Sequence, residues 1–340
     1  MYFNKIETNW RISQCCLFND TGLAKLYNPG TVTKTYALKP DGKQKVQAKA
    51  IANVTKLRDV LKNYFSKQPI NLRSFRISSE LLPCYTLEET SSWYEEILPT
   101  LSCILQEAGE YAKKYEIRLS THPAQFTVLG SDKAVVVKNS IKDLEYHATI
   151  GKLMQLNPED FVINIHLSGL YGGTREAGIK RFATNFQYLS DYAQRALAVE
   201  NEDKHKSGYD IEHTLNLAQY TPIRCTLDIH HYECYRKKLN FITHNDRYFK
   251  DAVKTWKNTR PLFHVSHTKI DELGTDIKRI NQHSDVLHDL ERLAITTPML
   301  EYADFDIEAK NKEQAVMHAY KFFKEEEKYA GEIILCKSLI

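Results

Sequence analysis

Phe161-Val-Ile-Asn-Ile-His166 is an apolar, strand-forming run that ends in a side chain able to bind a metal ion. The same arrangement recurs along the chain, where short apolar runs end in an acid or an imidazole at residues 120–122, 199–200, 228–231, 263–264 and 306–308. Buried histidines alone would not require one such group at the end of successive strands. An enzyme built on a β/α barrel does require them, because its site lies at the carboxyl ends of the strands.

Strand-like and helix-like patterns alternate along the whole chain. The predicted strands cover residues 10–17, 72–78, 117–120, 161–166, 196–200, 224–229, 262–265 and 305–309. The predicted helices cover residues 46–65, 93–114, 132–156, 174–194, 210–220, 246–256, 285–293 and 312–329. Eight strands followed by helices predict an α/β protein, a single (β/α)8 TIM barrel with a metal site at the C-terminal ends of the strands. We expect one domain over residues 1–340, and a long substrate-facing loop at residues 19–45.

The composition excludes several classes of protein. It is that of a globular chain, with 42% hydrophobic residues, 26% charged residues and a net charge of +3 that does not by itself predict nucleic-acid binding. No apolar run approaches the roughly 20 residues that span a bilayer, and no signal peptide is visible, so we expect a cytoplasmic or nuclear protein that is not secreted and contacts no membrane. The seven cysteines form no CxxC pair and are expected to be reduced. Neither GxGxxG nor GxxxxGK[ST] occurs, which argues against a nucleotide cofactor.

Eight residues at or just beyond the predicted strand ends are candidate metal ligands. They are His122, His166, Glu200, Asp228, His231, His264, His283 and Glu308. A carboxylate that ends an apolar strand is costly to desolvate unless a cation meets it, and that cation is either a metal ion or an Arg or Lys side chain. Mixed His and carboxylate ligands suit Zn²⁺, Mn²⁺ or Fe²⁺ better than Ca²⁺ or Mg²⁺. Eight ligands are too many for one ion, so we expect a cluster of two or three, a type of site suited to phosphodiester hydrolysis.

Two further points concern the residues around Asp228. Asp228 and His230 are predicted to point to the same side of a strand, while His231 falls at the turn that follows it. Serine or cysteine nucleophile chemistry is disfavoured, because no GxSxG motif exists and Cys225 is expected to be an interior strand residue.

Five longer strings give the chain a family resemblance. They are FRISSELLP at residues 75–83, LSTHPAQF at 119–126, IHLSGLYGG at 165–173, LAVEN at 197–201 and IEAKNKE at 307–313. Together with D-x-x-H and H-x-S in order between them, they resemble the UV damage endonuclease family, over nearly the whole chain from about residue 10 to about residue 320. That family is similar to endonuclease IV and the wider xylose isomerase-like barrels.

The resemblance implies a DNA repair enzyme that nicks damaged double-stranded DNA immediately 5′ to UV photoproducts, both cyclobutane dimers and 6-4 photoproducts. The products would carry 3′-hydroxyl and 5′-phosphate ends, and the enzyme is expected to act as a monomer. It further implies that the eight residues hold two or three divalent ions, with manganese preferred over zinc, cobalt or magnesium. The resemblance assigns catalytic roles to Glu200, Glu308 and Lys310. Gln125 and Phe126 would fill the space left by the flipped dinucleotide, as an aromatic wedge can replace lost stacking.

The chain departs from the family pattern at three places. Leu262 stands where the family carries a metal-bridging lysine, and Leu87 stands near the position of a histidine close to the scissile phosphate. Gln14 replaces an aromatic DNA contact and is assigned to the lesion-binding set. Asp285 is a hypothetical substitute for the missing oxygen ligand, and His230 is expected to be either a bystander or a residue that lies just behind the metal ligands.

Three alternative functions remain open from the sequence. One is a general abasic-site endonuclease with the same metals, and the second is a sugar isomerase on the same barrel. The third is a lesion-binding protein that no longer cuts, an alternative suggested by Leu262 and Leu87.

Overall fold

The computed structural model describes residues 10–170, 173–206, 208–236, 241–269 and 280–338. Eight parallel strands form one sheet in the order β6-β5-β4-β3-β2-β1-β8-β7. The strands are β1 (Ile12–Cys15), β2 (Ser74–Ile77), β3 (Arg118–Thr121), β4 (Val162–His166), β5 (Leu197–Glu200), β6 (Arg224–Thr226), β7 (Leu262–Val265) and β8 (Asp304–Ile307). A parallel bridge between Asp228 and His264 joins the two ends of this sheet. The sheet is therefore a nearly closed barrel, as the sequence predicts.

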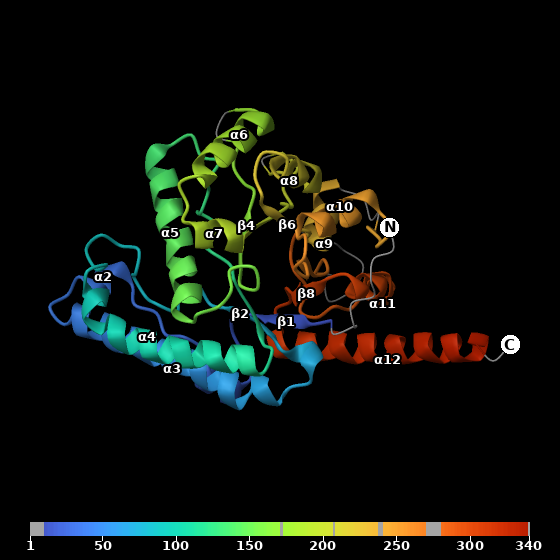
Figure 1. Cartoon of the computed structure of the whole chain (residues 1–340), viewed down its shortest axis with the longest axis horizontal. Coiled ribbons are helices and arrows are strands. Elements are labelled where there is room, and N and C mark those ends of the chain that lie inside the picture. Colours follow the sequence, from blue (N-terminus) through green and yellow to red (C-terminus); the bar gives the residue numbers. More distant parts are fainter. Residues whose placement is uncertain (1–9, 171–172, 207, 237–240, 270–279, 339–340) are drawn as a thin grey trace.

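Helices surround the barrel (Figure 1). They are α1 (Thr21–Leu26), α2 (Lys34–Ala37), α3 (Gly42–Asn63), α4 (Trp93–Lys114), α5 (Ala134–Leu153), α6 (Arg175–Phe186), α7 (Asp191–Ala196), α8 (Ile211–Leu217), α9 (Ile229–Arg236), α10 (Arg247–Thr255), α11 (Leu290–Thr296) and α12 (Lys312–Ser338), with short 3-10 helices at Phe65–Lys67, Ile70–Leu72 and Thr297–Glu301. The two long helices α3 and α4 lie side by side (Figure 1). No helix in the described part of the chain is long and apolar enough to cross a membrane.

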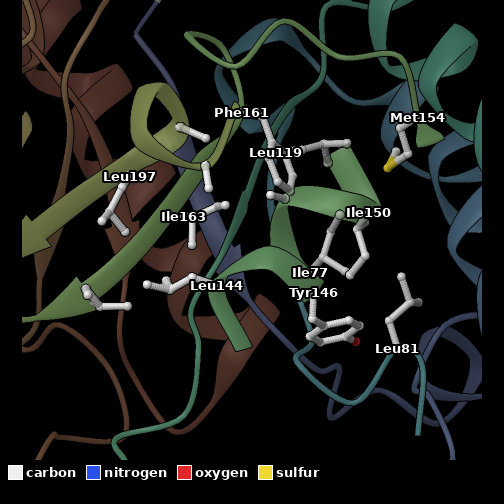
Figure 2. Packing of buried hydrophobic residues seen from close by; sticks show 14 of the residues in the cluster. Ile77, Leu81, Leu119, Leu144, Tyr146, Ile150, Met154, Phe161, Ile163 and Leu197 are labelled. Carbon is white, nitrogen blue, oxygen red and sulfur yellow. The ribbon is translucent and has the colours of Figure 1, made fainter. Parts of the chain in front are cut away.

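The core between strands and helices fixes which strand residues face outward. Ile77, Leu119 and Ile163 of three adjacent strands pack in one apolar cluster with Leu144 and Ile150 of α5 (Figure 2). Each fully buried aliphatic side chain of this kind contributes about 1.5–3 kcal/mol to folding. Because side chains alternate along a strand, the residues between these outward-facing ones must point into the barrel. The acids and imidazoles of the strands occupy those inward positions.

The prediction of a long loop at residues 19–45 is wrong. The segment holds helices α1 and α2 and the start of α3. Asp20 accepts a hydrogen bond from the Leu23 backbone N–H, and Thr33 accepts one from the backbone N–H of Tyr36, so side chains cap both short helices. Helices of six and four residues are too short to show hydrophobic periodicity, and packing on the barrel stabilises them.

Three other boundaries also differ from the prediction. The helix expected over residues 174–194 is divided into α6 and α7, because Ser190 caps the second helix through its contact with the Ala193 backbone N–H. The strand expected over residues 224–229 ends at Thr226, and Ile229 already belongs to α9. The helix expected at residues 285–293 begins only at Leu290, after Asp289 caps it.

Candidate metal centre and DNA-facing loop

Glu200 lies at the centre of the candidate site, at the carboxyl end of β5. Its side chain is fully buried, and four imidazoles surround its two oxygens. Oε2 lies 3.4 Å from His122 Nε2 and 3.2 Å from His264 Nδ1, while Oε1 lies 3.0 Å from His231 Nδ1 and 3.9 Å from His166 Nδ1. Five of the eight predicted ligands therefore meet around one carboxylate.

The other three predicted ligands join the same cluster through His264 and Glu308. Asp228 Oδ2 lies 3.9 Å from His264 Nδ1, and Glu308 Oε1 lies 3.3 Å from the same nitrogen. His283 Nδ1 lies 3.7 Å from Glu308 Oε2. The fold thus brings together residues from β3 through β8 and from the loop that contains His283.

Two subsets of the cluster have the spacing of a metal site. The donor atoms of His122, His166 and Glu200 lie within 4.8 Å of one another, as do those of Glu200, Asp228 and His264. Glu200 belongs to both groups. Each group would offer both nitrogen and oxygen donors to a divalent ion.

The electrostatics of the cluster call for positive charge. Burial opposes the ionisation of Glu200, but the imidazoles of His264 and His166 outweigh it and hold the pKa of this carboxyl well below its usual range. Burial alone would lower the pKa of His264, yet Glu200 and Glu308 raise it to about 9. The acids therefore draw a proton onto a buried imidazole. Divalent ions would satisfy the same acids and displace that proton, since metal ligands must be deprotonated.

Several buried atoms of the cluster also lack hydrogen-bond partners. Within the described residues these include Oε1 of Glu200, Oδ2 of Asp228, Nδ1 of His166 and both ring nitrogens of His264. Leaving so many buried polar atoms without partners would cost about 1–3 kcal/mol each. The donor set therefore fits bound metal ions, and burial lowers the pKa of His166 to about 4, which keeps its imidazole neutral for coordination.

Three of the five histidines have one ring nitrogen fixed by a backbone carbonyl. His122 Nδ1 lies 3.0 Å from the Pro123 oxygen, His231 Nδ1 lies 3.0 Å from that of Asn201, and His283 Nδ1 lies 2.9 Å from that of Glu308. Each contact is suited to a hydrogen bond in which Nδ1 donates. At His122 this leaves Nε2, which faces Glu200, as the free ligand atom, whereas Nδ1 of His231 also faces Glu200 and Nδ1 of His283 also faces Glu308.

The local structure around His230 and His231 corrects the sequence interpretation. Both residues lie on helix α9, so His230 does not share a strand face with Asp228. The Asp228 side chain accepts a hydrogen bond from the His231 backbone N–H at 2.7 Å and so holds the start of the helix. His230 is buried instead against Cys234, with its Nε2 3.6 Å from the sulfur. It stays outside the ligand set, as expected.

Sequence reasoning missed three residues that touch the cluster. Asn164, two residues before His166 on β4, donates a hydrogen bond of 2.5 Å to Glu200 Oε2. Arg76 of β2 donates one of 2.5 Å to Glu308 Oε1. Asp306 is fully buried two residues before Glu308. The period of two along a strand was the available signal for Asn164 and Asp306, because each shares a face with a predicted ligand.

The Gln125–Phe126 pair forms the tip of a tight turn beyond β3. The Thr127 backbone N–H donates to the Ala124 carbonyl at 2.9 Å, and the Thr127 hydroxyl bonds to Asp143 of α5 at 2.5 Å. Both tip side chains are exposed, and that of Phe126 is 69% exposed. An aromatic ring that projects from an anchored turn is available to a partner, whereas a ring packed into the core would not be.

The structure contradicts the assignment of Gln14 to the lesion-binding set. Gln14 pairs in register with Phe75 and Ile307, so it faces the helix layer rather than the barrel interior. It is 3% exposed, and its amide donates to the Leu17 carbonyl at 2.9 Å. The side chain is therefore not available for a DNA contact.

The remaining sequence candidates lie at the edge of the cluster or apart from it. The Lys310 side chain is exposed two residues beyond Glu308. Leu262 is 1% exposed and belongs to the apolar core. Asp285 is half exposed and lies 3.8 Å from the Lys269 ammonium, so the structure does not favour it as a replacement ligand. Leu87 is half-buried in the segment between β2 and α4.

Histidines and carboxylates converge at the strand ends of this (β/α)8 barrel. The fold and the site therefore place the protein among the barrel proteins with a candidate polynuclear metal centre. The sequence profile described as UV-endonuclease UvdE matches residues 26–337. The chain belongs to this family.

Individual relatives agree with this assignment. A UV-damage endonuclease of Schizosaccharomyces pombe is 32% identical over 289 residues, which cover 81% of this chain and 44% of that protein. A UV DNA damage endonuclease of Bacillus mycoides is 31% identical over 255 residues, 72% of this chain and 73% of that protein. The chain spans less than half the length of the fungal relatives from Neurospora crassa (42%) and S. pombe (44%).

Solved structures show the same fold. The crystal structure of SacUVDE matches with a TM-score of 0.75 and 25% identity, over 94% of this chain and 99% of that one. Endonuclease IV from Thermus thermophilus matches with a TM-score of 0.53 and 13% identity, over 94% of this chain and 99% of that one, which is a likeness of fold alone.

Proposed function

We propose that this protein is a metal-dependent endonuclease that nicks duplex DNA immediately 5′ to UV photoproducts and leaves 3′-hydroxyl and 5′-phosphate ends. The observation that carries the proposal is the convergence of the predicted ligands on Glu200 and Glu308 at the carboxyl ends of the strands. Membership of the UV-endonuclease family supports the choice of substrate. We further propose that residues 1–340 act as one domain and as a monomer.

Two or three divalent ions, with Mn²⁺ preferred, would occupy the cluster. His122 and His166 with Glu200 would hold one ion, and Asp228 and His264 with Glu200 would hold a second. A third ion would depend on the remaining ligands of the set, which are His231, His283 and Glu308. When bound, such ions supply Lewis-acid activation of water and stabilise negative charge on the phosphate.

The chain's own residues would bind and orient the DNA around these ions. Phe126 and Gln125 would enter the duplex at the lesion, where a poorly stacked step is cheap to open. The anchoring of their turn to α5 through Thr127 and Asp143 limits the entropy lost when they enter. Lys310, exposed beside Glu308, would neutralise a phosphate near the scissile bond.

The test is incision of an end-labelled duplex that contains one cyclobutane dimer, in Mn²⁺ and in chelator. We expect a nick immediately 5′ to the dimer that a polymerase can extend, and no nick in chelator. Glu200→Gln should lower the incision rate by at least about 100-fold, the upper range found for residues that merely support metal ligands. Glu176→Gln on α6 is the matched control, because that carboxylate is 67% exposed.

Three results would contradict the proposal in different ways. Nicking of abasic duplex without nicking of photoproduct duplex would indicate an abasic-site endonuclease. Tight binding of photoproduct DNA without incision in Mn²⁺ would indicate a lesion-binding protein. Incision by Glu200→Gln at the rate of the unmodified chain would show that the candidate metal centre is not needed for the reaction.

A further inference from the structure

His264 differs from three of the other histidines of the cluster. Its Nδ1 faces the acids, 3.2 Å from Glu200 Oε2 and 3.3 Å from Glu308 Oε1. Its Nε2 faces Asp306, at 3.6 Å from Oδ2. Three other histidines, His122, His231 and His283, have a backbone carbonyl within 3.0 Å of Nδ1, but no such carbonyl contacts the His264 ring within the described residues.

Asp306 is a buried carboxylate without a hydrogen-bond partner of its own. It is fully buried, and neither of its oxygens has a hydrogen bond within the described part of the chain. His264 and Asp306 are paired in register on neighbouring strands, which sets the two side chains next to each other inside the barrel. A carboxylate in this position costs several kcal/mol in desolvation unless a proton donor or a cation meets it.

We propose that Asp306 is a positioning residue whose carboxylate accepts a hydrogen bond from Nε2–H of His264 and so fixes Nδ1 as the metal-ligating nitrogen. The inference rests on the proposed function only in taking the cluster to bind metal. The Nε2 to Oδ2 distance needs to shorten by about half an ångström to reach ordinary hydrogen-bond length. Carboxylate–histidine–metal arrangements of this kind fix the tautomer and increase the basicity of the ligand.

Among the described residues, Asp306 belongs to neither group of donor atoms with the spacing of a metal site, and the cation beside it is Arg76. Its Nη1 lies 3.7 Å from Asp306 Oδ2 and also donates to Glu308 Oε1. Arg76 therefore neutralises Asp306 on one side, and the other side is left to accept the His264 proton.

Asp304 provides a matched control for mutagenesis. It lies two residues before Asp306 on the same inward face of β8 and is equally buried. Its partners are Arg118 and Arg260, each at 2.6 Å, and neither belongs to the cluster. Asp304→Asn should lower the stability of the fold but leave the metal affinity of the folded protein unchanged.

The experiment measures zinc affinity by competition with a chelator, per folded molecule, in the full chain. Asp306→Asn should weaken binding about 10- to 100-fold, the range for loss of an outer partner of a metal-ligating histidine. Asparagine keeps the shape but offers only a neutral acceptor. Affinity that is unchanged in Asp306→Asn, or that falls equally in Asp304→Asn, would overturn the inference.

A second measurement is made on the unmodified chain and needs a variant only to assign the signals. In the zinc-loaded protein labelled with ¹⁵N-histidine, the ring of His264, assigned by loss of its signals in His264→Asn, should carry its proton on Nε2. A proton on Nδ1 would overturn the assignment. Failure of the unmodified chain to bind zinc or Mn²⁺ would overturn the proposed metal centre and this inference together, whereas the preceding outcomes overturn the inference alone.

Discussion

Replacing Phe126 by alanine separates lesion recognition from folding. The ring is 69% exposed, so only about a third of its surface is covered by the protein. At about 25 cal/mol per Å² and roughly 200 Å² for a whole ring, that third contributes at most about 2 kcal/mol to folding. Stacking of an aromatic ring on a base is worth about 1–3 kcal/mol. Phe126→Ala should therefore weaken binding to photoproduct duplex about 10- to 100-fold while the protein remains folded.

The assay is equilibrium binding of labelled duplexes in the Glu200→Gln background, which should prevent incision during the measurement. Tyr188→Ala is the control, because Tyr188 is also an aromatic residue with 69% exposure. The affinity of Phe126→Ala for undamaged duplex should lie within about twofold of that of the unmodified protein, because in undamaged duplex the ring does not take the place of a flipped base. Equal losses of affinity for damaged and undamaged DNA, or equal losses for Phe126→Ala and Tyr188→Ala, would refute the proposed insertion of Phe126 at the lesion.

Three further predictions concern the barrel itself. Asp304→Asn should lower the free energy of unfolding in a denaturant titration by about 3–5 kcal/mol, because it leaves the buried guanidinium groups of Arg118 and Arg260 without their anion; a loss below about 1 kcal/mol would contradict this. Burial lowers the pKa of His147 to about 3, so protonation favours the unfolded state and stability falls by about 1.4 kcal/mol per pH unit below pH 6.5. His147→Leu should remove that dependence of the free energy of unfolding on pH between pH 6 and pH 4.5. If the stability of the variant and that of the unmodified protein fall in parallel with pH, His147 is not the cause. Chelation should lower the melting temperature and Mn²⁺ at 100 times its Kd should restore about 2.7 kcal/mol per site, a gain that Glu200→Gln should reduce.

Much of the barrel could be predicted because its signals are local. Apolar runs of four or five residues mark strands, and the strand β7 and the helix α4 have the predicted bounds. The ligand set followed from the same pattern, because a parallel barrel gathers the carboxyl ends of all its strands at one face.

Helix α9 shows where local signals fail. The run Ile229-His-His-Tyr-Glu-Cys-Tyr-Arg236 is rich in residues with modest helix propensity and lacks a clear apolar stripe. Its helical state depends on Asp228, which accepts the His231 backbone N–H, and on burial against β7. Both are tertiary effects, so the sequence suggested a strand that continues to Ile229.

The inward face of β8 explains why the candidate metal centre lies at one end of the barrel. Three acids follow one another at period two, namely Asp304, Asp306 and Glu308. Arg118 and Arg260 each form an ion pair of 2.6 Å with the first of them, so side chains already neutralise its charge. Glu308 meets the imidazoles of His264 and His283 as well as Arg76, and an imidazole, unlike a guanidinium, can bind a cation through a free ring nitrogen. Asp306 lies between these two acids on the strand, with Arg76 on one side and His264 on the other. This position suits it to orient a metal ligand rather than to be one.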